Sequence, residues 1–591
     1  MTAHLARRRP LASLLQRWVS AGVLTESDAM VAASCAELAG ERDERVLLAM
    51  ALAVRAPRSG HVALDLAAVR DQVLAEMEHL DPAAVSATQS LDWPDDPDAW
   101  LASVMESQLV AASGAPLVVD LGLIYLRRFH RHEVSVADRI RALATMAASG
   151  AGRLDDVARV LELDDGQRDA VARCVSGRLG VLTGGPGTGK TRTVAALLAA
   201  LIAGSDGDVR IALAAPTGKA AARMAESIDA SVSLLTGSGD DEFERIGEMI
   251  AELRPSTIHR LLGVRGGGVG FRHDTDRPLA HDVVVIDEAS MVSLPLMDGV
   301  LHALGPQARL ILVGDAGQLA SVDAGSVLGD VAGAGGAIQE RVAELQESRR
   351  FPSESRIGRF AEAIRAGNGS HARQILDEPV GDGEPEGVVL RRVDTPSRVT
   401  GEIDAQVAVI VEAARHGDAA TAVHSLDALR VLCAHRSGRA GVSFWNRAIE
   451  SRIAALGRVS SGMYPGRPLM ITRNDPARRL FNGDVGVVIR TDDGPRVAFG
   501  GEAEPRLIAP SHLEGTETVH AMTIHKSQGS EFDHVVVVLP SADSRLATRE
   551  LLYTAVTRAR RQVTLIGDGA VVEAAIGRTS ARTSGLRQRL S

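Results

Sequence analysis

The sequence is poor in cysteine and in aromatic residues. Its three cysteines, Cys35, Cys174 and Cys433, are far apart and form no CxxC pair. This spacing excludes a zinc ribbon, an iron–sulfur cluster and a disulfide framework, and it is typical of a reducing compartment. Aromatic residues make up only 3% of the chain, whereas alanine, glycine and arginine are abundant. This bias reflects genome composition more than chemistry.

Long hydrophobic runs and a surplus of positive charge are also missing. No apolar run reaches the roughly eighteen residues that a membrane span needs. Arg7 to Arg9 resemble the start of a secretion signal, but Pro10 follows and Gln16 interrupts the apolar stretch. We expect instead an amphipathic helix from Leu11 to Trp18, no membrane contact, and a cytoplasmic protein. The net charge of −10 argues against a basic coat for duplex DNA but leaves room for a local basic channel.

The chain is long enough for several domains. At 591 residues it exceeds what one core can hold, and about three to five domains are expected. Residues 1 to about 150 have a mostly helical pattern and no catalytic constellation. His130 and His132 have no third ligand nearby, so we interpret them as part of a solvated face rather than a metal site.

From about residue 151 short β-branched runs alternate with helical segments. The runs GVLT, RIALAAPT, HDVVVIDEAS and ARLILVGDAGQ are each followed by a loop rich in functional side chains. This pattern predicts an α/β fold with a doubly wound parallel sheet and functional loops at the carboxyl ends of its strands. After an acidic, glycine-rich stretch near residues 376–387, a second set of β and α segments follows. Within it, alternating strands with Asn-Gly and Asp-Gly turns predict a small inserted antiparallel barrel.

The most specific motif is LGVLTGGPGTGKTRTV, at residues 179–194. An apolar strand, a glycine-rich turn and a helix follow one another, which is the full Walker A pattern. Backbone N–H groups of such a turn surround phosphate, while Lys190 adds a positive charge and Thr191 offers a hydroxyl to Mg²⁺. The predicted nucleotide-binding residues of this motif are Gly184, Gly185, Pro186, Gly187, Thr188, Gly189, Lys190 and Thr191.

Two further strand ends carry candidate catalytic residues. Asp287 ends the run VVVIDE, where its carboxylate can hold Mg²⁺ through water, and Glu288 is placed to orient or deprotonate the attacking water. These acids favour nucleotide hydrolysis over mere binding. Asp315 and Gln318 follow the run LILVG, and the Gln318 amide can both sense the γ-phosphate and reach toward a ligand groove.

Two arginines far along the chain are candidates for completing the nucleotide site. They are Arg350 in SRRF and Arg558 in LLYTAVTRAR. P-loop enzymes often receive an arginine from across an interface, because guanidinium stabilises charge on the transferring phosphoryl group.

The order of these motifs resembles superfamily 1 helicases, and within them the RecD family, the alpha subunit of exodeoxyribonuclease V. The matching strings are GGPGTGKT, APTGKAAARM, STIHRLL, VVVIDEAS, GDAGQLASV, SRRF, AMTIHKSQGSEF and YTAVTRAR. They extend from about Leu163 to Asp568, and LLAMALAVRAPRSGHVALDL is similar to the family's N-terminal domain.

The resemblance implies an architecture. We expect two RecA-like P-loop motor domains, a helical N-terminal domain and a small inserted SH3-like β-barrel. The expected bounds are 1–150 for the helical domain, 151–340 for the first motor domain, 341–460 with 520–591 for the second, and 461–519 for the barrel. A strand-separating hairpin is expected within 225–281, although a plain glycine-rich surface loop is the alternative there.

The resemblance also implies residue roles. Gln167 would recognise the adenine edge, which favours ATP, and Glu531 would contact the ribose. Arg350 and Arg558 would reach the γ-phosphate from the second motor domain. The residues expected to line a single-strand groove are Thr217, Thr257, His259, Thr523 and His525. Such hydroxyls and imidazoles bind phosphate and sugar without distinguishing bases, although Thr257 could equally cap a helix.

The function implied by the resemblance is ATP-dependent, Mg²⁺-requiring translocation on single-stranded DNA, 5′ to 3′. The chain would act on double-stranded DNA ends as one subunit beside RecB-like and RecC-like chains, with no nuclease site of its own. A stand-alone RecD-like helicase is one alternative. A subunit that binds DNA ends with ATP but does not translocate is another.

The N-terminal region carries a prediction about assembly. We expect the apolar faces of Leu11 to Trp18 and of Leu47 to Leu66 to be too large for a small helical domain to cover. They would dock on a RecC-like subunit and leave the motor domains free to open and close. The alternative is that they pack against the first motor domain of the same chain.

Overall fold

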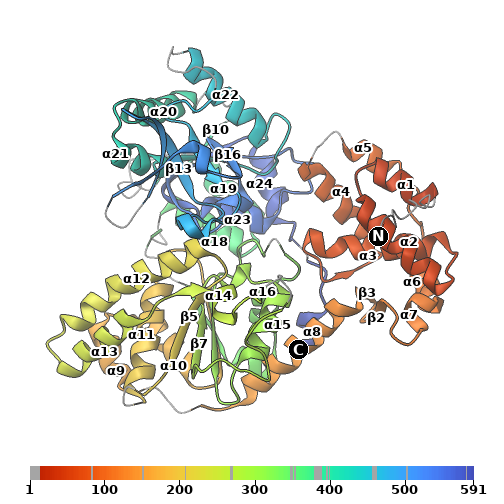
Figure 1. Ribbon diagram of the computed structural model, residues 1–591, viewed down its shortest axis with the longest axis horizontal. Helices are drawn as coiled ribbons and strands as arrows, with labels where there is room; N and C mark the ends of the chain where they lie inside the picture. Colours follow the sequence, from red (N-terminus) through yellow and green to blue (C-terminus); the bar gives the residue numbers. More distant parts are fainter. Residues whose placement is uncertain are drawn as a thin grey trace, which may run out of the picture.

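The computed structural model describes most of the chain. The described residues are 13–80, 84–148, 152–205, 208–265, 270–321, 323–346, 350–351, 355–378, 389–393, 397, 399–455, 462–500, 504–580 and 582–591. Within these ranges no helix combines the length and the apolar character required to cross a membrane. Figure 1 shows three parts: an N-terminal region and two units that are each built on a sheet.

The N-terminal region is helical, with one small antiparallel sheet of order β1-β3-β2. Its helices are α1 (Ser13–Ser20), α2 (Glu26–Ala39), α3 (Glu44–Arg55), η1 (Ala56–Ser59), α4 (Val69–Leu80), α5 (Ala84–Gln89), α6 (Pro97–Glu106), α7 (Gln108–Ala111) and α8 (Arg127–Thr145), and its strands are β1 (Ala63–Leu64), β2 (Leu117–Asp120) and β3 (Leu123–Leu126). Helix α3 is apolar around most of its circumference, because every residue from Leu48 to Ala53 is buried. It therefore forms the centre of this region's core.

The expectation that this region cannot cover its own apolar faces is wrong. Leu15 and Trp18 of α1 are fully buried, and Leu14 is 6% exposed. They pack with α3 in a core made only of N-terminal residues. Leu11 lies outside the described residues. The α1 face and most of the segment Leu47 to Leu66 are therefore covered within the region itself. Val62 and Ala63 pack instead in the core of the first sheet unit, so the alternative of packing against that unit is met at these two residues.

The first sheet unit contains a six-stranded parallel sheet of order β6-β5-β7-β8-β4-β9. Its strands are β4 (Leu179–Gly184), β5 (Ile211–Ala215), β6 (Ser256–Thr257), β7 (Val283–Ile286), β8 (Arg309–Gly314) and β9 (Val342–Leu345). One face is covered by α9 (Leu154–Val160), α10 (Asp165–Val175), α11 (Lys190–Ala203), α12 (Gly218–Thr236) and α13 (Asp241–Glu252). The other is covered by α8, α14 (Ile258–Leu262), α15 (Leu294–Ala303), α16 (Val327–Ala332), α17 (Gly336–Gln339) and the C-terminal α25 (Leu586–Leu590). Strands β4, β5 and β7, and β8 after Arg309, are buried on both faces, which explains their continuous apolar runs.

The second sheet unit contains a five-stranded parallel sheet of order β10-β19-β18-β11-β17. Its strands are β10 (Val389–Val393), β11 (Leu429–Cys433), β17 (Ala521–Thr523), β18 (Phe532–Val538) and β19 (Ala559–Ile566). Helices α18 (Arg356–Arg365), α19 (Gly369–Asp377), α23 (Arg549–Val556) and α24 (Gly569–Ile576) cover one face. Helices α20 (Thr400–Arg415) and α22 (Val442–Ala455) cover the other, and α21 (Ala419–His424) joins α20 against the inserted sheet. The predicted α/β class with parallel sheets is confirmed.

The insertion between α22 and β17 is an antiparallel sheet of order β15-β14-β13-β12-β16. Its strands are β12 (Pro468–Ile471), β13 (Val485–Thr491), β14 (Gly494–Phe499), β15 (Arg506–Ile508) and β16 (Thr516–Thr518). A two-residue turn joins β13 to β14, with Gly494 at φ 103°. Strands β15 and β16 are the edges, so the pairings do not close a barrel.

The segment expected to hold a strand-separating hairpin is largely helical. Helices α12 and α13 form a helical hairpin, followed by β6 and α14. An isolated antiparallel bridge joins Val264 to Phe271 around the glycine-rich loop. Residues 266–269 of that loop lie outside the described residues.

The N-terminal region contacts both sheet units. Buried Glu133 of α8 accepts hydrogen bonds from Gly585 N (3.0 Å) and Arg589 Nε (2.9 Å) of the C-terminal segment. At the other end, Arg545 N donates to Glu78 Oε2 of α4 at 3.0 Å. The region therefore forms a bridge between the two units (Figure 1).

Candidate functional site

The phosphate-binding turn is built between β4 and α11, as the sequence predicts. Gly187 and Gly189 have φ of 79° and 81°, a backbone conformation that residues with a Cβ rarely adopt. Thr188 Oγ1 donates to Gly185 O at 2.8 Å and holds the turn closed. Lys190 Nζ donates to Gly184 O (2.6 Å) and Gly185 O (2.8 Å). The ammonium thus lies inside the turn, where phosphate oxygens would replace the carbonyls as its partners.

The two acids of the second motif lie at the end of β7. Glu288 N donates to Asp287 Oδ1 at 2.8 Å. Burial, with the charge of Glu288, raises the pKa of Asp287 to about 6, although Lys190 opposes this. Glu288 has a left-handed backbone at φ 51°, a conformation that costs a non-glycine residue about 1–3 kcal/mol. A bound cation near these two acids would lower the pKa of Asp287 again.

A hydrogen-bonded chain joins the two sheet units beside this site. Gln318 Nε2 donates to Asp315 Oδ2 at 2.7 Å, and Arg558 Nη2 donates to Gln318 Oε1 at 2.7 Å. Asp315 and Gln318 follow β8 of the first unit, whereas Arg558 precedes β19 of the second unit. Arg558 is 4% exposed, and burial lowers the pKa of its guanidinium while the carboxylates of Glu288 and Glu531 oppose that shift.

Arg350 forms an ion pair with Glu531 of the second unit. Its Nη2 is 2.9 Å from Glu531 Oε1. Burial alone would raise the pKa of Glu531, but the charge of Arg350 holds it below its ordinary value. Arg350 Nη1 is buried and has no hydrogen-bond partner within the described part of the chain. A guanidinium with one satisfied and one open nitrogen is suited to receiving an anion.

Gln167 is 1% exposed and lies against the phosphate turn. Its Nε2 donates to Thr188 O at 3.4 Å, and its backbone N donates to Asp164 Oδ1 at 2.8 Å as part of a helix cap. The structure thus brings it to the nucleotide site, and its contact with adenine stays a prediction, as does the ribose contact of Glu531.

Tyr553 of α23 is a site residue that the sequence argument missed. A Cβ built on Gly185 would lie 2.6 Å from the Tyr553 hydroxyl, and one on Gly317 would lie 3.5 Å from its ring. The phenol of the second unit therefore reaches both the phosphate turn and the loop of Gln318. Its place in the string LLYTAVTRAR, five residues before Arg558, was the available signal.

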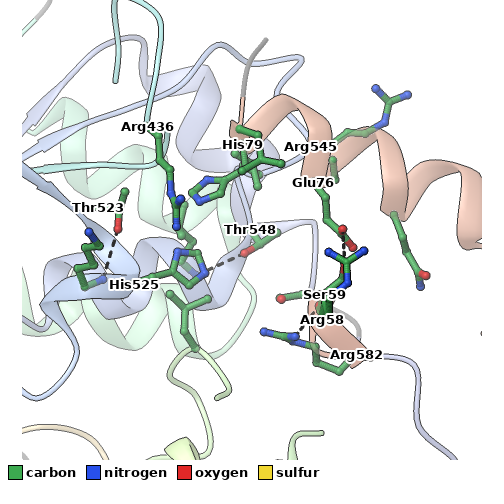
Figure 2. A pocket seen from close by; sticks show the side chains of 18 of the residues that line it. Arg58, Ser59, Glu76, His79, Arg436, Thr523, His525, Arg545, Thr548 and Arg582 are labelled. Carbon is green, nitrogen blue, oxygen red and sulfur yellow. Dashed lines mark hydrogen bonds between the residues drawn. The ribbon is translucent and has the colours of Figure 1, made fainter. Parts of the chain in front are cut away.

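The residues expected on a single-strand groove are only partly brought together. Thr217, Thr523 and His525 line one cavity of about 1390 Å³ (Figure 2). Thr257 and His259 lie on β6 and α14 and do not line it. Each of the three threonines also caps a helix: their Oγ1 atoms accept from Ala220 N, Arg260 N and Lys526 N.

His525 is held neutral in this cavity. Burial, together with the charges of His79, Arg582 and Arg436, lowers its pKa to about 3. Its Nδ1 is buried without a hydrogen-bond partner within the described ranges. A neutral imidazole with an open nitrogen can bind a phosphate or sugar oxygen without adding charge.

ATP and Mg²⁺ are implied by these motifs, and the residues fit them. Lys190 supplies positive charge at the turn, Arg558 supplies it at Gln318, and Arg350 Nη1 is open within the described part of the chain. Thr191 and Asp287 would hold Mg²⁺, which would neutralise phosphate charge and restore a low pKa to Asp287. The described residues contain no group of three or more histidine, cysteine or acidic side chains that could hold a metal by themselves.

Three family models match separate parts of the chain. An AAA domain model matches residues 167–324. A UvrD-like helicase C-terminal domain matches 518–566. The N-terminal domain of the RecBCD enzyme subunit RecD matches 20–125. The three segments coincide with the first sheet unit, the end of the second, and the N-terminal region.

Curated relatives match nearly the whole chain. The RecBCD enzyme subunit RecD of Mycobacterium tuberculosis strain H37Rv is 44% identical over 588 residues, covering 98% of this chain and 96% of the relative. The subunit of the same name from Mycolicibacterium smegmatis is also 44% identical and covers 98% and 99%. The ATP-dependent RecD2 DNA helicase of Deinococcus radiodurans is 31% identical, covering 82% of this chain but 61% of the relative. The chain therefore belongs to the RecD family of DNA helicases.

Proposed function

We propose that this chain is the ATP-driven motor subunit of a RecBCD-type complex and moves 5′ to 3′ along single-stranded DNA. The observation that carries the proposal is the contact of Arg558 with Gln318, which links the second sheet unit to the nucleotide site of the first. A ligand that draws the two units together at this contact changes their relative position, and hydrolysis reverses the change. A strand held across both units is moved by each cycle.

The proposal assigns roles to the parts of the fold. The N-terminal region corresponds to 1–150, the motor domains to 151–340 and to 341–460 with 520–591, and the insertion at 461–519 to an SH3-like unit whose described strand pairings leave the barrel open. Lys190 and Thr191 bind the phosphates and Mg²⁺, Glu288 orients water, and Arg350 and Arg558 stabilise charge on the γ-phosphate. The protein acts on DNA ends in the cytoplasm.

The partners are RecB-like and RecC-like subunits, and the exposed apolar residues of α2 form the docking face for them. Leu38 is 90% exposed and Met30 56%, with Val31 beside them at 45%. Spacings of one and eight residues place them on one side of the helix. An apolar stripe on an otherwise well-packed region is typical of a protein interface. We therefore propose this stripe on α2 as the docking surface in place of the apolar faces of α1 and α3, which are already buried.

A stand-alone helicase is the second candidate, favoured by the RecD2 match. That relative is considerably longer than this chain, since the alignment covers 61% of it. The RecBCD subunits match end to end at higher identity. The subunit role therefore has the stronger support.

Steady-state ATP turnover with and without a dT oligonucleotide tests the motor. Stimulation by the oligonucleotide, with displacement of streptavidin from a 3′-biotin but not from a 5′-biotin, is the expected result for 5′ to 3′ movement. DNA binding without stimulation would establish a non-translocating end-binding subunit instead. Unwinding by the purified chain alone, unchanged by RecB-like and RecC-like chains, would favour the stand-alone helicase.

A further inference from the structure

The cavity that holds Thr217, Thr523 and His525 is enclosed by more than the two sheet units. Its lining also includes residues of η1 and α4 from the N-terminal region, and residues 578–580 and Arg582 near the C-terminus. Figure 2 shows Glu76 of α4, with Arg58, Ser59 and Arg582, across the space from Thr523 and His525, whereas His79 of α4 lies beside His525. We call η1, α4, residues 578–580 and Arg582 the third wall.

The third wall is fixed to the motif residues of the second unit. His79 Nδ1 is 2.9 Å from Ala434 O, and the rings of His79 and His525 meet edge to face at 5.5 Å. Arg582 Nη1 donates to Ser59 O at 2.7 Å and ties the C-terminal segment to η1. The wall is thus an integral part of the cavity.

Positive charge is concentrated around this cavity. Eight lysine and arginine side chains line it against three carboxylates, although the whole chain carries a net charge of −10. A concave site lined by one sign of charge focuses the field and attracts the opposite charge. The expected ligand is therefore an anion with several charges.

Several of these cations have no carboxylate partner within the described ranges. Lys219 Nζ donates to Ser530 Oγ at 2.8 Å, and Arg582 and Arg578 donate to backbone carbonyls. In the part of the chain that the structure describes, no ion pair holds the exposed Arg436. Burial lowers the pKa of Lys219 to about 8, which reflects the cost of a charge without a counterion. An incoming phosphate would remove that cost.

We propose that the third wall is part of the nucleic-acid site, and that it contacts the phosphodiester backbone of the single strand held by Thr523 and His525. The proposal rests on the motor function proposed above. It assigns to the N-terminal region a direct role in holding the strand, beside its role in assembly. Lys219 and Arg436 bind phosphates at the boundary between the wall and the sheet units.

Ala75 offers a direct test because it lines the cavity on α4, is half-buried, and has no polar side-chain contact to lose. Ala33 is the matched control, since it is also a half-buried helical alanine but lies on α2 and does not line the cavity. The full chain carries Ala75→Glu, Ala75→Lys, Ala33→Glu or Ala33→Lys, and binding of fluorescent dT20 is measured from low to high salt. Circular dichroism verifies folding.

The expected result is opposite effects at position 75 and none at position 33. Ala75→Glu weakens binding about three- to tenfold, whereas Ala75→Lys strengthens it. Ala75→Lys also makes the slope of the logarithm of the binding constant against the logarithm of the salt concentration steeper by about 0.7, the value for one added phosphate contact on a single strand. Arg436→Ala, at an exposed site that tolerates truncation, lowers the slope by a similar amount, and Arg436→Lys retains it.

Two outcomes overturn the proposal and are distinguishable. If the wild-type chain binds dT20 and the variants at position 75 behave like those at position 33, the third wall does not touch the strand, while the motor proposal stands. If the wild-type chain does not bind dT20 at all, both proposals are wrong.

Discussion

The guanidinium of Arg558 donates a hydrogen bond to Oε1 of Gln318 at 2.7 Å, across 240 residues of sequence and between the two sheet units. Through Gln318 it is connected to Asp315 at the nucleotide site. Because the guanidinium is buried and the amide is partly buried, this contact is sensitive to any charge placed close to it. A nucleotide that binds between the units therefore acts on the contact directly.

Truncation of Lys190 tests the phosphate turn. Lys190→Ala should reduce DNA-stimulated ATP hydrolysis by about a hundred- to thousandfold, equivalent to about 2.7–4 kcal/mol, because a preorganised charge on the phosphates is lost. The measurement is steady-state phosphate release at saturating dT oligonucleotide. Arg192→Ala, on the same helix α11, is the control and should retain near-normal turnover. Normal turnover in a folded Lys190→Ala chain would overturn the Walker A assignment.

A double-mutant cycle tests the link between the units. Gln318→Ala and Arg558→Ala should each lower the turnover number by about tenfold or more, and the double variant should be little worse than Arg558→Ala alone. Non-additivity follows because either substitution breaks the same contact. Nucleotide affinity, measured separately by fluorescent ADP binding, should change less than turnover in Gln318→Ala. Strictly additive losses would mean that the two residues act independently.

The raised pKa of Asp287 has a consequence for stability. Its pKa of about 6 in the folded chain lies above the usual value near 3.8, so the folded state binds a proton more tightly than the unfolded state. This contribution is fully present below about pH 4 and is lost as the pH rises through 6. Asp287→Asn should therefore stabilise the nucleotide-free protein at pH 7 by about 1–3 kcal/mol and have little effect at pH 4.

Thermal unfolding of wild-type and Asp287→Asn chains at both pH values measures this effect. The variant should at the same time lose Mg²⁺-dependent ATP hydrolysis, since the amide cannot replace the carboxylate. A lower unfolding temperature for Asp287→Asn at pH 7 would show that Asp287 is stabilised as an anion and would contradict the prediction.

Charge placed on α2 tests the docking face. Leu38→Glu should prevent co-purification with RecB-like and RecC-like chains while leaving DNA-stimulated ATP turnover intact, because Leu38 is 90% exposed and distant in sequence from every motif residue. Leu234→Glu on α12, where the leucine is 38% exposed, is the control and should co-purify normally. Equal recovery of both variants in the complex would place the interface elsewhere.

The sequence by itself determined the local geometry of the nucleotide site. Gly187 and Gly189 adopt the positive φ that their lack of a Cβ allows, and Asp287 follows a buried strand as predicted. These features depend on backbone preferences and strand burial within about ten residues. A short sequence motif therefore contains the information that determines them. The same holds for the turn between β13 and β14 of the antiparallel insertion, whereas the pairing of β12 with β16 joins strands far apart in the sequence.

Only the tertiary structure decided which distant residues meet. The helical pattern predicts an apolar face that includes Trp18. Whether a partner protein or the N-terminal region itself covers this face depends on the packing of α3. Likewise Tyr553 reaches Gly185, and His79 of the N-terminal region reaches His525, because separate units are docked at particular angles. Such docking is set by the summed shape and charge of large surfaces, so no short stretch of sequence contains it.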